Sequence, residues 1–255
     1  MPFSPLAAVK EVQDVSLLTW RAFRGAFRRP FYLRDILTQM DMIGVGSLAV
    51  VMLTGFFTGA VLTLQTSKSL AQFGAKALTG QLVAISLVRE LGPVLAALMV
   101  AGRVGSGIAS ELGSMLVTEQ INAMRALGTD PIKKLVVPRV VATTTMLPVL
   151  TVVADAIGVL GGLFIAVAVL QISPSLYLSS AWDGLKYMDL FGGILKPIVF
   201  GATLSVVGCY CGLRTYGGTQ GVGRSTTQAV VAASILILIF NLFLNRKSTR
   251  LNSSH

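Results

Sequence analysis

Five apolar runs divide this sequence, and each is long enough to cross a membrane as a helix. About 20 helical residues span the roughly 30 Å hydrocarbon core of a bilayer. Backbone polar groups find no water there, so such runs fold as helices that pair these groups internally. The composition agrees, because 53% of the residues are hydrophobic and 13% are charged. The predicted spans are Ile43–Leu64, Leu82–Ile108, Val140–Leu170, Leu190–Leu213 and Thr226–Asn245.

These spans predict an all-α polytopic membrane protein. Residues 1–42 form a cytoplasmic N-terminus with an interfacial helix, and residues 43–245 form a five-span domain. The third span carries Pro148, which predicts a tilt or a kink. The last run, RKSTRLNSSH at residues 246–255, resembles the translation of a sequencing-adapter oligonucleotide. We expect it to be a processing scar, with a few native residues missing after the fifth span.

The distribution of Lys and Arg predicts how the spans are oriented, because cytoplasmic loops carry an excess of both. They gather in the N-terminal segment, in residues 118–139, and in the fourth connection at Arg214 and Arg224. The alternate connections hold Lys68, Lys76 and Lys186. We therefore expect the N-terminus in the cytoplasm and the C-terminus outside.

The segment Val9–Leu37 mixes aromatic rings with arginines. Trp20, Phe23 and Phe27 share one helical face, which predicts a helix lying in the cytoplasmic interface; a solvated leader is the alternative. The formal net charge of +10 then favours anionic lipid headgroups over nucleic acid as its partner.

A polar insertion, TEQINAMRALGTDPIKKLVVPR at residues 118–139, lies between the second and third spans. Its pattern predicts two short helices. Glu119 begins the first near the positive end of the helix dipole, and Gly128 ends it in a left-handed conformation. Asp130 caps the second, with Pro131 at its first position.

The first of these helices is amphipathic, because Ile121, Met124 and Leu127 recur on one face. That face lies too far from the bilayer core to be buried in lipid. We therefore expect it to dock into a groove of another protein; packing on its own bundle is the alternative.

Ionisable residues inside the spans are costly and indicate a functional site by default. Glu90 lies three residues before Pro93 and Lys196 lies directly before Pro197, where backbone groups are freed, and Arg89 adjoins Glu90. They either line a cavity for the headgroup of an amphiphile or form a structural ion pair. Arg103 and Asp155 receive no role from the sequence.

Metal and nucleotide sites are disfavoured. The single histidine, His255, lies in the adapter-like tail, and Cys209 and Cys211 lack a second pair of ligands. In GGTQGVGRS, two glycines have the spacing of a phosphate-binding loop, but Arg224 stands where that motif has lysine. We expect a tight turn there, with Ser225 or Thr226 capping the last span.

Glycines inside the spans predict close helix packing and a dimer. They are Gly102, Gly105, Gly107, Gly158, Gly161, Gly162, Gly201, Gly208 and Gly212.

Two stretches resemble the MlaE-type (YrbE-like) permeases, the membrane subunits of ABC transporters that work with MCE proteins. They are LVRELGPVLAALMVAGRVGSGIASELGSMLVTEQINAMRALGTDPIKKLVVPRVVA and GGTQGVGRSTTQAVV, and the resemblance extends from about Leu33 to Leu244. It implies a bacterial inner-membrane homodimer with an interfacial N-terminal helix and five spans. It also implies partners: a separate ABC ATPase subunit that uses ATP, a periplasmic MCE-domain protein, and phospholipid. No cofactor is expected in this chain.

The resemblance assigns residue roles as well. The insertion becomes a coupling helix that seats in the ATPase and carries its movement to the second and third spans. Its residues are Glu119, Gln120, Ala123, Met124, Arg125, Leu127, Gly128 and Asp130. A lipid cavity with a few polar residues is implied near the substrate-binding candidates Arg89, Glu90 and Lys196.

The leading hypothesis is a lipid transport permease without catalytic residues. One alternative is an intramembrane enzyme that uses Glu90 and Asp155 as a carboxylate pair, although no nucleophile or metal ligand accompanies them. The other is a non-catalytic membrane scaffold, which would explain the docking helix without transport.

Overall fold

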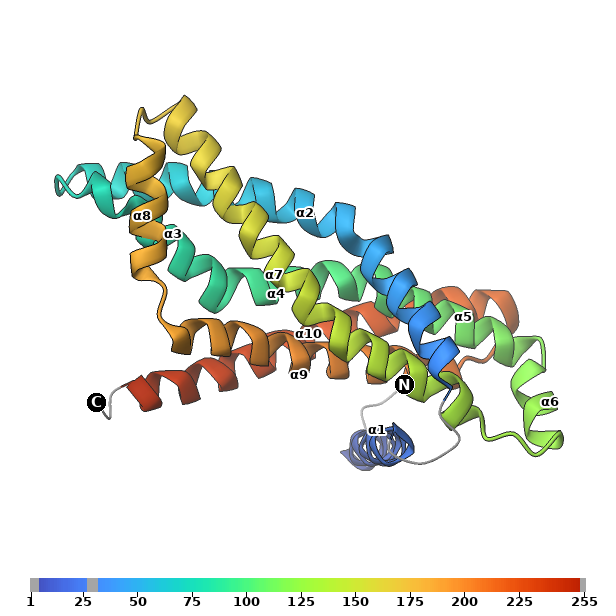
Figure 1. The fold of residues 1–255 in the computed structure, drawn as a ribbon. Coiled ribbons are helices and arrows are strands. Elements are labelled where there is room, and N and C mark those ends of the chain that lie inside the picture. The colour runs from blue at the N-terminus through green and yellow to red at the C-terminus, as the bar shows by residue number, and fades with distance from the viewer. Residues whose placement is uncertain (1–4, 27–31, 253–255) are drawn as a thin grey trace. The chain divides into compact units, whose positions relative to one another are not determined.

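A computed structural model describes residues 5–26 and 32–252, and these residues are almost entirely helical (Figure 1). No β-strand occurs within these two ranges. The α-helices are α1 Pro5–Ala26, α2 Leu33–Ala71, α3 Thr79–Ser86, α4 Gly92–Val100, α5 Ser106–Val117, α6 Gln120–Ala126, α7 Val137–Ala168, α8 Pro174–Gly184, α9 Tyr187–Leu213 and α10 Gly218–Asn252. A short 3-10 helix, η1 Lys76–Leu78, precedes α3, and three π-helical segments interrupt the longer helices: η2 Leu87–Leu91, η3 Ala101–Gly105 and η4 Ile132–Val136.

Five helical segments are long and apolar enough to cross a membrane, which confirms the predicted number. They are Leu33–Ala71, Lys76–Val117, Ile132–Ala168, Tyr187–Leu213 and Gly218–Asn245. The third ends at Ala168 and not at the predicted Leu170, which lies in a turn. Pro148 lies inside α7 without ending it.

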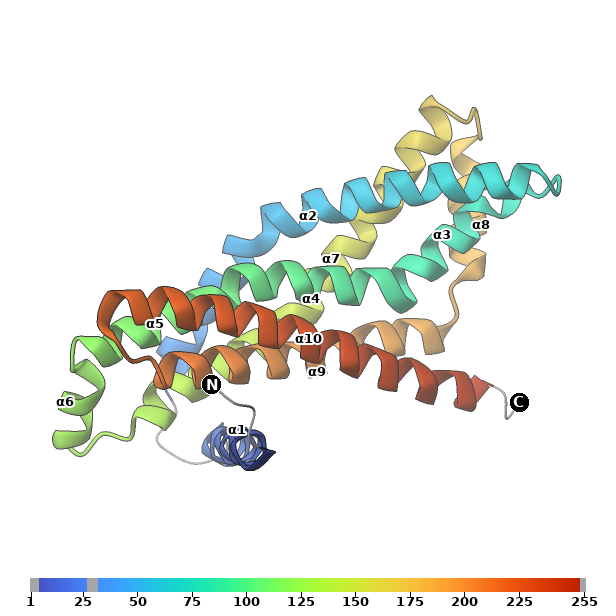
Figure 2. The ribbon, with the colours of Figure 1, turned by 180° about the vertical axis from the view of Figure 1, so that it is seen from behind.

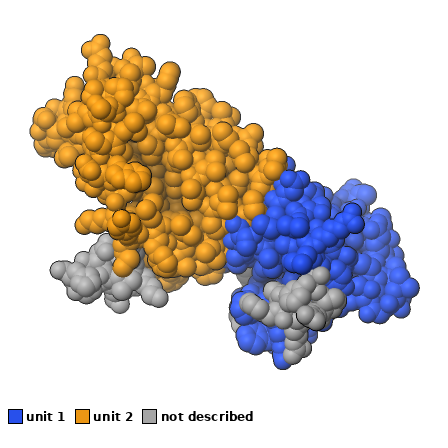
Figure 3. Space-filling model, in the orientation of Figure 1, with its two compact units in different colours: residues 1–43, 101–145, 201–237 blue, residues 44–100, 146–200, 238–255 orange. Residues whose placement is uncertain are grey.

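The chain divides into two compact units (Figure 3). Unit 1 comprises residues 1–43, 101–145 and 201–237, and unit 2 comprises residues 44–100, 146–200 and 238–255. The polar insertion belongs to unit 1, and α3 and α8 belong to unit 2.

Glycines bring helix backbones together inside unit 2. A Cβ added at Gly59 of α2 would lie 1.8 Å from the carbonyl oxygen of Gly158 in α7, and one at Gly55 would lie 2.5 Å from that of Ala154. Likewise α8 packs across α3, where Gly80 meets the backbone of Ala181 (Figure 1 and Figure 2). The contact at Gly158 confirms the close packing predicted for that glycine.

Unit 1 combines similar glycine contacts with an ion pair between a buried arginine and an exposed glutamate. Gly201 of α9 faces the backbone of α7 at Thr143, and Gly212 faces α5 at Ala109. The buried Arg139 guanidinium lies 2.7 Å from the Glu111 carboxylate, which joins α7 to α5.

The helix in the N-terminal segment ends earlier than predicted. Helix α1 ends at Ala26 and α2 begins at Leu33, so Val9–Leu37 is not one continuous interfacial helix. Trp20 and Phe23 are both exposed on α1, as an interfacial face requires, whereas Phe27 lies outside the described residues.

The local signals in the polar insertion are confirmed. Gly128 has a φ of 76° and ends the turn after α6, and Asp130 Oδ1 accepts a 3.0 Å hydrogen bond from the Ile132 amide. The predicted second helix is not separate, because Pro131 begins a helical segment that continues through η4 into α7. The insertion therefore presents one free helix, α6.

The Asp130 cap yields a stability prediction. Substitution Asp130→Ala leaves the amide of Ile132 without its acceptor, and loss of such a cap costs about 1 kcal/mol. We expect faster amide hydrogen exchange at the start of η4, measured by mass spectrometry. The exposed Asp183 of α8 provides the control, because Asp183→Ala leaves exchange at η4 unchanged. Equal exchange in the native protein and the Asp130→Ala variant would contradict the cap.

Candidate functional site

A polar cavity in unit 2 brings together the three predicted substrate-binding residues. Its volume is about 40 Å³, which is room for a few water molecules. The residues that line it are Arg89, Glu90, Met188, Asp189, Gly192, Lys196 and Asn245. We call this set the charged cluster.

The backbone of η2 positions Arg89 and Glu90. In this π-helical turn the amide of Gly92 donates to the carbonyl of Leu87, five residues earlier. Pro93 follows and has no N–H to give, so the Arg89 carbonyl four residues before it lacks its normal helical donor. The Arg89 carbonyl is therefore open to a donor from outside its own helix.

Lys196 supplies the missing donor. Its Nζ donates one hydrogen bond to the Arg89 carbonyl and another to Asn245 Oδ1. The side chain is only 7% exposed, so these bonds hold an ammonium that has little contact with solvent. Lys196 thus joins α9 to η2 and to α10 within unit 2.

The ion pair in the charged cluster joins Arg89 to Asp189, at 3.3 Å between Nε and Oδ1. The ion pairs recorded among the described residues do not include one between Glu90 and Lys196, although both residues line the cavity. The sequence left two interpretations open for Glu90 and Lys196: a shared cavity or an ion pair with each other. The structure supports the shared cavity, and the ion pair in it joins Arg89 to Asp189.

Sequence reasoning missed Asp189 and Asn245. Asp189 lies two helical turns before Lys196, so both face the same side of α9, and this spacing was a usable signal. Asn245 ends the fifth predicted span and had no local signal, because only the packing of α10 brings it to Lys196.

The predicted coupling residues lie on and beside α6 in unit 1. Ile121 is fully buried and anchors the helix, whereas Leu127 is 83% exposed. Met124 is half-buried, and the other predicted residues, Glu119, Gln120, Ala123, Arg125, Gly128 and Asp130, are exposed. The apolar face is therefore split: Ile121 packs on its own unit and Leu127 points away from it.

Two further predictions can be compared with the geometry. Gly217 and Gly218 have φ values of 86° and 66°, which confirms a tight turn at the phosphate-loop-like sequence. The predicted cap is wrong, because α10 already begins at Gly218 and the Ser225 hydroxyl donates to Val222 O inside the helix.

The carboxylates proposed for an intramembrane enzyme do not share a cavity. Glu90 lines the polar cavity, and Asp155 lines another one in unit 2. The structure therefore gives the pair no common site at which a substrate atom meets both.

A polytopic helical chain with a small charged cluster inside its spans has the features of a membrane transport protein. Residues 36–246 match the model of the family described as Permease MlaE. The chain belongs to the MlaE permease family.

Individual relatives agree with this assignment. A probable ABC transporter permease protein of Rickettsia felis is 47% identical over 232 residues, which cover 91% of this chain and 90% of the relative. One from Synechocystis is 42% identical over 89% of this chain and 87% of its own length. The chloroplastic protein TRIGALACTOSYLDIACYLGLYCEROL 1 of Arabidopsis thaliana is 36% identical over 96% of this chain and 71% of its own length. The family identifies a transport permease subunit and not a catalyst.

Proposed function

We propose that this chain is the permease of an ABC transporter that moves phospholipid or a related lipid between the bacterial inner membrane and a periplasmic MCE-type partner. A separate ABC ATPase binds α6 and hydrolyses the ATP. The N-terminus lies in the cytoplasm and the C-terminus on the periplasmic side.

The observation that carries the proposal is the exposure of Leu127. A partner protein that docks on this polar connection between two spans would remove the Leu127 side chain from water. Ile121 holds α6 against unit 1, so a force applied at Leu127 is passed to the helices on either side, α5 and η4. A contact at Leu127 is therefore suited to an ATPase subunit that moves the spans.

The lipid substrate is supported by three observations. The family is one of permeases, and the name of the Arabidopsis relative includes a glycolipid, trigalactosyldiacylglycerol. The charged cluster contains both signs, with Arg89 and Lys196 beside Glu90 and Asp189, which suits a headgroup that carries charge. The 40 Å³ cavity itself is too small for a lipid, so in this proposal the cluster contacts the headgroup when the helices separate.

The homodimer is supported by open glycines in the second span. A Cβ added at the exposed Gly102 or Gly107 meets no atom of the described chain within 4 Å. Small residues on an uncovered helix surface let a second helix approach closely. We propose that a second copy of the chain packs there.

The test is co-purification of this chain with its ATPase, comparing the native sequence with Leu127→Asp. A carboxylate in place of the exposed leucine cannot enter an apolar groove, so we expect the variant to retain less than a tenth of the bound ATPase. Leu127 makes few contacts with its own chain, which makes it a cleaner choice than the half-buried Met124.

The control is Phe73→Asp. Phe73 is 81% exposed in the connection between α2 and η1, which is periplasmic in the proposed orientation. This variant keeps its ATPase. If Leu127→Asp also keeps it, the coupling helix is not where the ATPase binds. If no ATPase binds the native chain, the scaffold interpretation replaces the transporter.

A further inference from the structure

Asp155 of α7 is an acidic residue with no assigned partner in the interior of unit 2. Its exposed fraction is 9%, and its Oδ1 atom is buried without a hydrogen bond from any described group. Most buried polar atoms have a partner, because leaving one unpaired costs free energy. The charged cluster does not include this residue.

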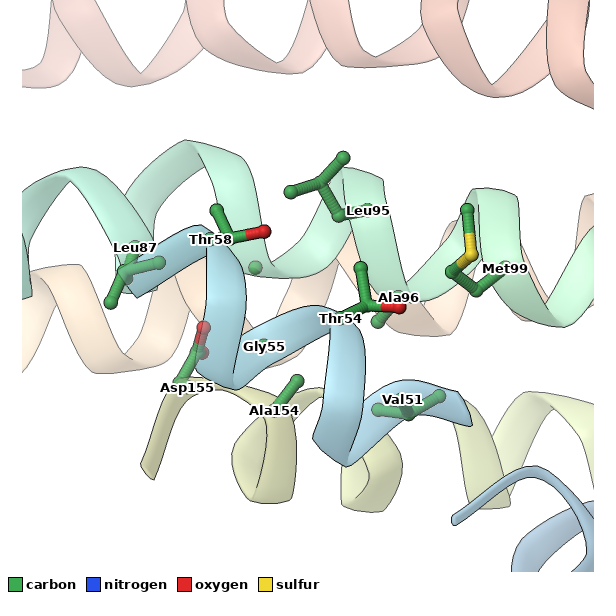
Figure 4. Close-up of a pocket in the computed structure, with 11 residues that line it drawn as sticks. Val51, Thr54, Gly55, Thr58, Leu87, Leu95, Ala96, Met99, Ala154 and Asp155 are labelled. Carbon is green, nitrogen blue, oxygen red and sulfur yellow. The ribbon is translucent and has the colours of Figure 1, made fainter. Parts of the chain in front are cut away.

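The Asp155 carboxyl points from α7 toward α2 and borders a cavity of about 10 Å³, which is room for about one water molecule (Figure 4). The lining is almost entirely apolar. Besides Asp155 it includes Thr54, Gly55 and Thr58 of α2, Leu87 of η2, and Gly92 and Leu95 of α4.

Gly92 lets the carboxyl approach the backbone of α4. A Cβ at this position would lie 1.7 Å from Asp155 Oδ1, so no other residue type fits without a shift. The amide of Gly92 already donates to Leu87 O, and the hydroxyl of Thr54 donates to Val50 O at 2.7 Å. These two donors are therefore occupied.

Neutralising cations do not line this cavity. Among the described lining residues, those from α2, η2 and α4 carry no titratable side chain, and Asp155 is the titratable group. The nearest charges along η2, Arg89 and Glu90, line the other cavity, and Lys196 donates to Arg89 O and Asn245. An ionised carboxylate at such a place is very costly, and a neutral carboxylic acid costs much less.

We propose that Asp155 is a proton-binding site, occupied while α7 is packed on α2 and α4, and emptied when that contact opens and water reaches the carboxyl. A metal cation fits the cavity poorly, because hard cations need several oxygen ligands and the space holds about one water. A proton needs no ligand shell. Binding converts the carboxylate and a hydronium ion into a carboxylic acid and water.

The proposal fixes the direction of a pH effect. The packed form binds the proton and the open form releases it, so a rise in pH favours opening. The pH dependence of opening begins at about pH 4, near the ordinary pKa of an aspartate, because the opened form starts to lose the proton there.

Infrared spectroscopy of the full chain in a maltoside detergent, which has no ester or carboxyl carbonyl, tests the site directly. At about pH 6, roughly two units above the ordinary aspartate value, exposed carboxyls are ionised and give no carboxylic-acid C=O band. We expect a band of about one carboxyl per chain in the native protein, lost in Asp155→Asn and kept in Asp183→Asn. The exposed Asp183 of α8 is the matched control.

If Asp155→Asn does not fold, the native protein is instead labelled with carbon-13 in the side-chain carboxyl of aspartate. The label must shift the band of the native protein to lower frequency. No band at all, a band that the label leaves in place, or a band that persists in a folded Asp155→Asn overturns the proposal.

The thermal midpoint tests the link to packing. We expect the native midpoint to fall between about pH 5 and about pH 8 by more than that of Asp155→Asn. Equal slopes in the two proteins would show that the proton is not coupled to packing.

Discussion

The variant Gly59→Ala is expected to lose a large part of its stability although it adds a single methyl group. The new Cβ would lie 1.8 Å from the Gly158 carbonyl oxygen, which is backbone and cannot rotate away. The α2 and α7 segments of unit 2 must then separate, and overpacking of this kind costs about 1–3 kcal/mol. The measurement is the midpoint of thermal unfolding in detergent.

Gly223→Ala is the control for this prediction. Gly223 lies inside α10, and a Cβ there meets no described atom within 4 Å. Alanine has a higher helix propensity than glycine by up to about 1 kcal/mol, so this variant keeps or raises the midpoint. If both variants behave alike, the contact between Gly59 and Gly158 is not tight.

Lys196→Met is expected to destabilise unit 2 and to abolish transport. Methionine has a similar length but no donor, so the Arg89 carbonyl and Asn245 lose the ammonium. A buried acceptor left unpaired costs about 1–3 kcal/mol. The cost is read from thermal unfolding, and transport from lipid transfer between vesicles by the assembled transporter.

Two further variants isolate the cause. Lys186→Met removes an exposed lysine and leaves the midpoint unchanged. Pro93→Ala restores a backbone N–H that can reach the Arg89 carbonyl, so Lys196→Met costs less in that background than in the native one. Equal costs in both backgrounds would mean that the freed carbonyl is not what Lys196 stabilises.

The sequence predicted the features that depend on local pattern. Each span is a predominantly apolar run, and such a run forms a helix in lipid because its backbone polar groups must pair internally. The turn at Gly128 and the cap at Asp130 use groups within two residues of each other, so their spacing was sufficient. The composition of the insertion likewise indicated that α6 is a short helix outside the apolar runs.

Features that depend on packing between distant segments were not predictable from one sequence. Lys196 lies 107 residues from Arg89 and 49 from Asn245, and nothing in the local pattern selects these partners over Glu90. The π-helical turns are also absent from the prediction, because their apolar periodicity differs little from that of an α-helix. In the insertion, the prediction placed Ile121 and Leu127 on one helical face, whereas α6 ends at Ala126 and packing buries Ile121 and exposes Leu127.

The hydrogen bond at the Arg89 carbonyl differs in kind from those along the rest of its helix. A backbone amide is fixed in its place, whereas lysine carries its ammonium on a flexible four-carbon stem. The bond from Lys196 can therefore be exchanged for another acceptor without any turn of backbone being unwound. At the Arg89 carbonyl, the backbone of the second span is therefore stabilised by a side chain that can rotate to another acceptor.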